Sequence, residues 1–172
     1  MLGDDRPPAA LAEYTGFLMN WVAARSRLQF ARVLAESSGL HPREFGVLVM
    51  IARSPGISQH AIGEGAGVDP STMVAILDAL EERGLAERRP HPGDRRKRAI
   101  YLTDEGKYVL AKAQKAAAVV GKQVFAPLSQ DERRQLHELL VKLTGLNEAD
   151  PDYARRDAER LNQSVGRDAP RR

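Results

Sequence analysis

Residues 84–98 constrain the fold more than any other part of the chain. The segment begins with a glycine that can end a helix, continues as a short strand, turns at Pro92-Gly93 and returns as a basic strand. Between Arg88 and Arg98 it contains six basic residues and one acidic residue. We therefore expect a positively charged β-hairpin that directly follows a helix.

Two short helices are predicted immediately before this hairpin. Ser58 can cap a helix that runs to about Ala66, and a glycine-containing turn follows. Asp69 can then cap a second helix beginning at Pro70, because proline is favoured at the first helical position. The pair is a candidate helix-turn-helix followed by a β wing. The apolar residues of the second helix recur at helical spacing and are expected to face the core: Met73, Ile76, Leu77 and Leu80.

The polar leading end of the second helix is a candidate DNA-reading element. Ser71, Thr72 and Ala75 lie off the apolar stripe. A helix of this kind fits the major groove of duplex DNA, and the tip of a basic hairpin fits a neighbouring minor groove. We therefore predict a DNA-binding site made of residues from this helix and the hairpin: Ser71, Thr72, Arg88, Arg95, Arg96, Lys97 and Arg98.

Long amphipathic helices are predicted on both sides of this unit. One covers residues 11–39, Thr103 caps another after the hairpin, and Ser129 begins a capping box for a third. Their apolar stripes need a surface to bury against, and a second copy of the chain is the simplest one. The alternative is a three-helix layer within a monomer. The fold class predicted is mainly α-helical with a small β-hairpin wing.

This reading divides the chain into five parts. They are a flexible N-terminus (1–10), an N-terminal dimerisation helix (11–39), a winged helix-turn-helix (40–106), C-terminal dimerisation helices (107–146) and a polar, flexible tail (147–172).

Composition excludes several classes of site. There is no cysteine, so disulfides, thiolate metal sites and cysteine redox switches are excluded. No stretch approaches the roughly 18 to 20 apolar residues of a membrane span, and Met1–Ala10 has no apolar signal core, so we expect a soluble, cytoplasmic protein. The four histidines lack zinc-like spacing, and no nucleophile stands beside a positioned base. We predict no metal, no cofactor and no enzymatic activity.

Several short motifs follow one another in a fixed order along the chain. The chain has His41-Pro42-Arg43-Glu44-Phe45 and Pro55-Gly56-Ile57-Ser58-Gln59 at two helix entries, and Leu80-Glu81-Glu82-Arg83-Gly84-Leu85 before the hairpin. Asp94-Arg95-Arg96 fits a D-x-R wing element, and Leu102-Thr103-Asp104-Glu105-Gly106 fits an L-T-x-x-G close. Over about residues 11–146 the sequence therefore resembles the multiple-antibiotic-resistance regulator (MarR) family.

The resemblance implies a homodimeric transcriptional regulator, most often a repressor. Such a protein binds a pseudo-palindromic operator in double-stranded DNA and releases it when a small, often aromatic or phenolic, ligand binds. In family terms Asp94 orients Arg96 toward the minor groove, while Arg95 and Lys97 contact phosphates. The family cleft between the dimer helices and the winged domain implies these wall candidates for a ligand: Tyr14, Phe17, Trp21, His41 and Phe45.

One departure from the family pattern affects base reading. Many members have Thr-Arg in the middle of the recognition helix, where this chain has Val74 and Ala75. The usual arginine contact to a guanine edge is therefore in doubt. Base reading then falls to Ser71 and Thr72.

A second function remains open on the sequence alone. A winged helix can also serve as a protein-protein interaction module without a ligand response. Such a module tolerates loss of the wing charges, whereas a DNA-binding regulator does not.

Overall fold

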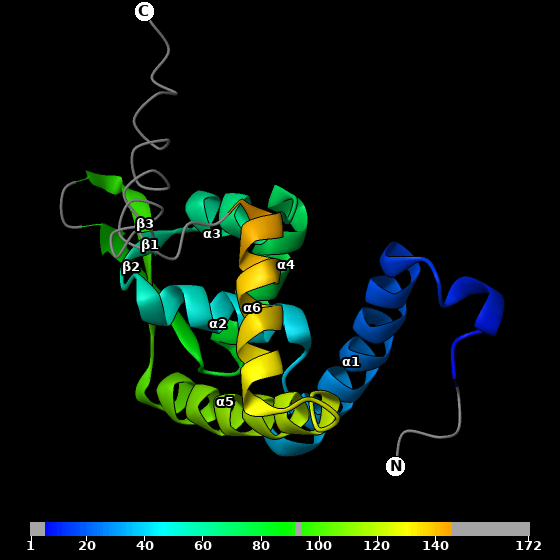
Figure 1. Ribbon diagram of the computed structural model, residues 1–172. Coiled ribbons are helices and arrows are strands. Elements are labelled where there is room, and N and C mark those ends of the chain that lie inside the picture. Colours follow the sequence, from blue (N-terminus) through cyan, green and yellow to red (C-terminus); the bar gives the residue numbers. More distant parts are fainter. Residues whose placement is uncertain (1–5, 92–93, 146–172) are drawn as a thin grey trace, which may run out of the picture.

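The computed structural model describes residues 6–91 and 94–145, and the side chains of residues 91–97 lie outside the described part. In chain order the elements are the 3-10 helix η1 (Ala9–Leu11), α1 (Thr15–Ser38), α2 (Pro42–Arg53), β1 (Ile57–Ser58), α3 (Gln59–Ala66), α4 (Pro70–Glu82), β2 (Ala86–His91), β3 (Asp94–Leu102), α5 (Asp104–Val124) and α6 (Gln130–Thr144). The mainly helical fold with a small β wing confirms the predicted fold class (Figure 1). The tail at 147–172, predicted to be flexible, lies outside the described residues.

Local capping contacts explain where the helices begin. The Ser58 hydroxyl accepts a hydrogen bond from the Ala61 N–H at 3.2 Å, and the Thr103 hydroxyl accepts one from the Gly106 N–H at 2.9 Å. At Ser129 the predicted capping box is present, with the Ser129 N–H donating to Glu132 at 2.7 Å. Each cap satisfies a backbone N–H that has no partner within its helix. These predicted helix starts are therefore confirmed.

The wing belongs to a sheet of three antiparallel strands with the order β1-β3-β2. The predicted hairpin is confirmed, with Ala86 opposite Leu102 at its base. The third strand, β1, is absent from the sequence prediction. Its two residues, Ile57 and Ser58, pair with Ile100 and Ala99, so β1 joins the wing to the beginning of α3.

The core lies where α1 to α5 and the sheet meet. Of the predicted stripe on α4, Met73, Leu77 and Leu80 are completely buried, and Ile76 is partly buried against the same core. Because this stripe is fixed by packing, the opposite side of α4 has to face solvent. The other fully buried large side chains come from four further elements and one loop: Leu34, Leu40, Val47, Leu48, Ile51, Ile62 and Ile100.

The base of the wing, the end of α4 and the beginning of α5 meet at one junction. The Thr103 hydroxyl donates to the Gly84 carbonyl at 2.6 Å, and the Thr103 N–H donates to the Leu85 carbonyl at 3.2 Å. Gly106 sits against this junction so closely that a Cβ atom there would lie 1.9 Å from the Leu85 carbonyl oxygen. The junction therefore requires glycine at this position.

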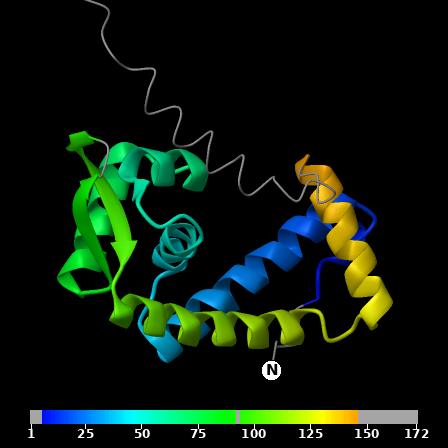
Figure 2. The same cartoon turned by 90° about the vertical axis from the view of Figure 1, so that its left-hand side faces the viewer.

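The elements on either side of the core lie at two ends of the molecule. Figure 2 shows α4 and the wing at one end, α6 and the first half of α1 at the other, and α5 running between them. The helix predicted from residue 11 begins at Thr15 instead, because Tyr14 has an extended backbone (φ −97°, ψ 105°) that separates it from η1. Among the described residues no helix is long and apolar enough to cross a membrane.

Candidate nucleic-acid interface

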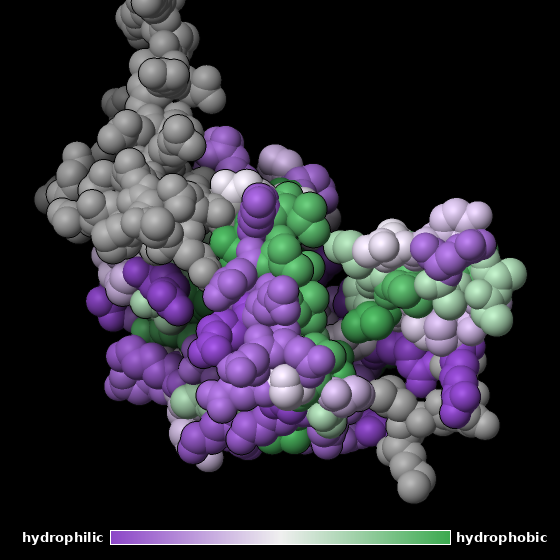
Figure 3. All heavy atoms as spheres, viewed as in Figure 1, coloured by the Kyte–Doolittle hydropathy of each residue, from purple (hydrophilic) through white to green (hydrophobic). Residues whose placement is uncertain are grey.

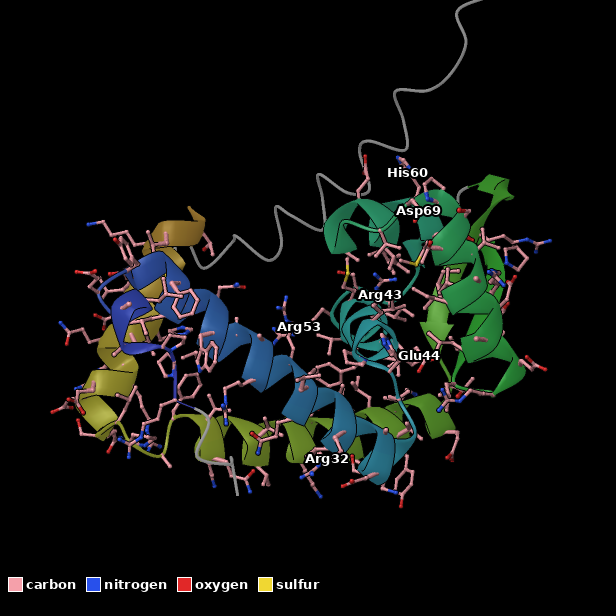
Figure 4. The ribbon with its side chains drawn as sticks, turned by 90° about the vertical axis from the view of Figure 1, so that its right-hand side faces the viewer. Arg32, Arg43, Glu44, Arg53, His60 and Asp69 are labelled. Carbon is pink, nitrogen blue, oxygen red and sulfur yellow. The ribbon has the colours of Figure 1, made fainter. Side chains whose placement is uncertain are left out.

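The helix-turn-helix and the wing present their polar ends on the same side of the molecule. Figure 4 shows His60, at the beginning of α3, and Asp69, before α4, on the side reached by the end of the wing that is away from α5. Gly67, in the left-handed conformation (φ 61°), ends α3 and allows the tight turn into α4. The backbone thus arranges a helix and a hairpin as the sequence predicted.

Asp69 fixes the first turn of α4 and also occupies its polar side chains. The Ser71 hydroxyl donates a hydrogen bond to the Asp69 carboxylate at 2.5 Å, and the Thr72 N–H donates one at 3.0 Å. These bonds hold the pKa of Asp69 well below its ordinary value because they favour the charged carboxylate, and the bond from Ser71 has the largest effect. The predicted base-reading residues Ser71 and Thr72 are therefore bound to the cap in the free protein.

The outward side of α4 carries no basic residue. Its exposed positions follow the helical repeat: Ser71, Val74, Ala75, Asp78 and Glu82. The whole helix contains three acidic residues and no lysine or arginine, so its charge is −3. A phosphate backbone is repelled by such a helix. Positive charge for DNA has to come from neighbouring elements.

The wing supplies part of that charge. The side chains of Asp94, Arg95, Arg96 and Lys97 lie outside the described residues, so their predicted roles stay predictions. Arg98 is exposed and its backbone pairs with Pro90 across the wing.

Arg88 is engaged within the protein. Its guanidinium forms an ion pair of 2.7 Å with Asp78 and a second ion pair with Glu81, and its backbone N–H donates to Glu81 at 2.8 Å. Its side chain is only 21% exposed. Arg88, which the sequence predicts as a DNA contact, therefore ties β2 of the wing to α4 and offsets one of the two negative charges with which it pairs.

Arg89, the next residue of β2, points to the side of the strand opposite to Arg88. It pairs with Glu87 and lies over the ring of Tyr101, 5.0 Å from the ring centroid. The Glu87 carboxylate raises the pKa of the Arg89 guanidinium, first through a hydrogen bond and then through charge attraction. Adjacent arginines of one strand thus have different partners, as the alternation of side chains along a strand requires.

The beginning of α2 adds a surface that the sequence prediction missed. An open groove of about 290 Å³ lies between it and α4, lined by Arg43, Thr72, Ala75 and Ala79 among others. Arg43 is exposed at the beginning of α2, where the helix dipole also favours anions. The signal for this site was present in the sequence as an arginine directly after His41-Pro42, at a helix N-terminus.

A charged contact holds α2 beside α4. Arg83, the residue directly after α4, donates to both oxygens of Glu44 at 3.1 and 3.2 Å and to the Gly39 carbonyl at 3.1 Å. Glu44 in turn accepts a 2.7 Å bond from the His41 N–H. The beginning of α2, the end of α1 and the end of α4 therefore keep a fixed spacing.

The five ligand-wall candidates fall into two groups. Phe17 contacts Trp21 with the ring centroids 5.8 Å apart and the rings tilted by 33°, about one turn from Tyr14, which directly precedes α1. Phe45 instead packs edge-on against Phe30 at 5.5 Å and belongs to the core. The ring of His41 accepts a bond from the Arg43 N–H at 3.2 Å and caps α2. Phe30, the partner of Phe45, follows Trp21 by about 13 Å along the helix, so the two aromatic contacts lie at different levels of α1.

Other chemical sites are not apparent in the described part of the chain. It contains no group of three or more histidine, aspartate or glutamate side chains that could hold a metal ion. A depression of about 390 Å³ lies between α3 and α4, lined by His60, Gly63, Val68, Asp69 and Met73 among others. It lies at the helix-turn-helix itself.

Comparison with known proteins agrees with this geometry. The model of the MarR family matches residues 38–97. A candidate regulatory protein for the hcr operon of Thauera aromatica is 37% identical over 115 residues, which cover 67% of this chain and 69% of the relative. Transcriptional regulator HosA of Escherichia coli is 34% identical over 113 residues, which cover 66% of this chain and 84% of HosA.

Solved structures extend the similarity to complexes. The repressor CouR of Rhodococcus jostii RHA1, bound to a 23-mer DNA duplex, superposes with a TM-score of 0.72 at 32% identity, covering 81% of this chain and 99% of CouR. The Mycobacterium tuberculosis protein Rv2887 in complex with DNA gives a TM-score of 0.66 at 28% identity, covering 81% of this chain and 98% of Rv2887. CouR has also been solved with p-coumaroyl-CoA, and Rv2887 with salicylic acid. The relatives are regulators of transcription, not enzymes.

Proposed function

Because this chain belongs to the MarR family of transcriptional regulators, we propose that it acts as a homodimeric repressor that binds a pseudo-palindromic operator and releases it when a small aromatic ligand binds. The observation that carries the proposal is the placement of α4, the wing and the beginning of α2 on one side of the molecule, with basic residues around an exposed helix. In a two-fold dimer, two such helices read half-sites about 34 to 36 Å apart. We place a protein with this DNA partner in the cytoplasm as part of the same proposal.

Exposed apolar residues at the other end of the molecule support the dimer. Figure 3 shows apolar side chains along one edge of α6, beside its hydrophilic front, and over the first half of α1. On α1 they include Met19 and Val22, which are 47% and 49% exposed, and on α6 they include Leu139 and Leu143, which are 52% and 71% exposed. Within the described residues α6 makes no extensive contact with any other element. A capped helix with an unburied leucine seam needs a partner, and this favours the dimer over a three-helix layer within a monomer.

Charge on the α6 seam is expected to separate the subunits. With Leu139→Glu and Leu143→Glu together, light scattering should give the mass of one chain, and operator affinity should fall because two half-sites are no longer held together. Tyr108→Glu, at a 61% exposed position on α5, is the matched control and should stay dimeric. A double variant that keeps the mass of two chains contradicts this interface.

Removal of one wing arginine is expected to weaken DNA binding. Arg96→Ala should cost about 1 to 3 kcal/mol per half-site in a gel shift at moderate salt, because a minor-groove or phosphate contact is lost. The matched control is Arg134→Ala, which removes the same charge from α6, where Arg134 pairs with Asp131 at 2.5 Å. Unchanged affinity in Arg96→Ala contradicts the wing assignment and favours the protein-protein interaction module.

We propose the ligand response because two of the similar proteins have been solved with aromatic compounds. They are CouR with p-coumaroyl-CoA and Rv2887 with salicylic acid. In this chain we assign the ligand contacts to Tyr14, Phe17 and Trp21, which are exposed or half-buried on α1. His41 and Phe45 already have structural contacts within their own chain. A screen of aromatic acids for compounds that raise the melting temperature and release DNA identifies the effector.

A further inference from the structure

The outward side of α4 offers methyl groups, rather than hydrogen-bonding groups, to whatever it faces. Val74 is 40% exposed and Ala75 is also exposed, side by side in the middle of the helix. Among the residues of α4 there is no arginine, lysine, asparagine or glutamine. The side chains that most often read guanine and adenine by paired hydrogen bonds are therefore absent from this helix.

The two polar residues that flank these methyl groups, Ser71 and Asp78, already have partners. The Ser71 hydroxyl donates to Asp69 at 2.5 Å. Asp78 forms a 2.7 Å ion pair with Arg88 of the wing. The cap at one end and the wing tether at the other thus enclose a central patch made of Val74 and Ala75, which we call the methyl patch.

Only one base carries a methyl group in the major groove. Thymine has its 5-methyl group there, whereas the groups that distinguish guanine, cytosine and adenine on that edge are hydrogen-bond donors and acceptors. Covering the polar edge of a G·C pair with methyl groups costs free energy because its hydrogen bonds to water are lost without replacement. Valine suits such a contact because its branched side chain has few conformations and loses little entropy.

Resting on the DNA-binding function proposed above, we infer that the methyl patch of Val74 and Ala75 reads thymine 5-methyl groups, so that each operator half-site has a T·A pair facing the middle of α4. Specificity then comes from apolar contact in the major groove. Affinity comes from the basic groups around the helix, because α4 itself has a charge of −3.

The test begins with selection of an operator from random duplexes by the wild-type dimer. Each thymine of the selected operator is then replaced by deoxyuridine, which lacks only the methyl group. At one or two positions per half-site the dissociation constant is expected to rise about fourfold, the value of one buried methyl group, and about 15-fold when both half-sites are changed. The slope of affinity against salt should not change, because no phosphate contact is lost.

A double-mutant cycle connects the effect to the patch. Val74→Ala should weaken binding to the thymine operator and should lose most of the discrimination between thymine and uracil. Val119→Ala, at a 50% exposed position on α5, is the matched control and should keep that discrimination. Melting temperatures of both variants verify folding.

The outcomes separate this inference from the function on which it rests. If an operator is selected and no uracil substitution weakens binding, or if Val74→Ala keeps the full discrimination, the methyl patch does not read thymine, although the protein still binds DNA. If no duplex is selected even at low salt, the proposed function itself fails, and this inference fails with it.

Discussion

Replacing Gly106 with alanine is expected to lower the free energy of unfolding by about 3 kcal/mol, near the upper end of the range for overpacking. The added Cβ would lie 1.9 Å from the Leu85 carbonyl oxygen and 2.8 Å from its carbonyl carbon. Both are backbone atoms, so no side-chain rotation relieves the clash. The Leu85 oxygen also accepts the Thr103 N–H at 3.2 Å, so its displacement loosens the junction of wing, α4 and α5. Urea unfolding at fixed protein concentration measures the loss.

Replacing a second helical glycine with alanine is expected to raise the free energy of unfolding rather than lower it. Gly46, in the middle of α2, has no atom within 4 Å of an added Cβ. Gly46→Ala is therefore expected to stabilise the protein by about 0.5 to 1 kcal/mol, since alanine favours helix. If Gly106→Ala unfolds at the same urea concentration as Gly46→Ala, the close approach at the junction is not present in solution.

The beginnings of the helices were predictable because a cap is a contact between near neighbours. The Asp69 cap joins residues three apart, and so does the Thr103 cap. A favourable residue type at the right spacing is then almost the whole signal. The apolar stripe of α4 was predictable for the same reason, since its period fixes which side is buried and which side faces outward.

Features that depend on distant pairings were not predictable. The strand β1 has two residues, too few for any alternation, and exists because Ile57 pairs with Ile100. The need for glycine at position 106 comes from a backbone segment about 20 residues earlier in the chain. Neither contact can therefore be predicted from local sequence patterns.

The candidate site was predictable as a surface, but not residue by residue. The basic run placed Arg88 among the predicted DNA contacts, whereas in the structure Arg88 pairs with two carboxylates of α4 and its neighbour Arg89 lies on the opposite side of β2. The partners of Arg88 are Asp78 and Glu81, one helical turn apart on α4. Because of this spacing, both carboxylates lie on the same side of α4 and can pair with one guanidinium, which the sequence alone indicates. That the guanidinium belongs to Arg88 is known only from the fold, which places β2 beside α4.

Replacing Arg88 with alanine is expected to weaken operator binding by about tenfold per half-site and about 100-fold for a dimer, because the wing loses its tether to α4. It also leaves Asp78 and Glu81 without their cation on a helix that has no other positive charge. Arg89→Ala is the matched control, since it removes the same charge from the next position of β2 and leaves the tether intact. Its effect on affinity should be small.

Glu81→Gln distinguishes a positioning role of Arg88 from a phosphate contact. If Arg88 contacts phosphate, removal of a nearby carboxylate reduces repulsion and frees the guanidinium, so DNA affinity rises, and Arg88→Ala lowers the salt slope by about 1. If Arg88 positions the wing, Glu81→Gln weakens DNA binding, since the Glu81 carboxylate accepts hydrogen bonds from both the guanidinium and the backbone N–H of Arg88. We expect weaker binding in Glu81→Gln and an unchanged salt slope in Arg88→Ala. Tighter binding in Glu81→Gln together with a smaller slope in Arg88→Ala makes Arg88 a DNA contact, as its place in the basic run suggests.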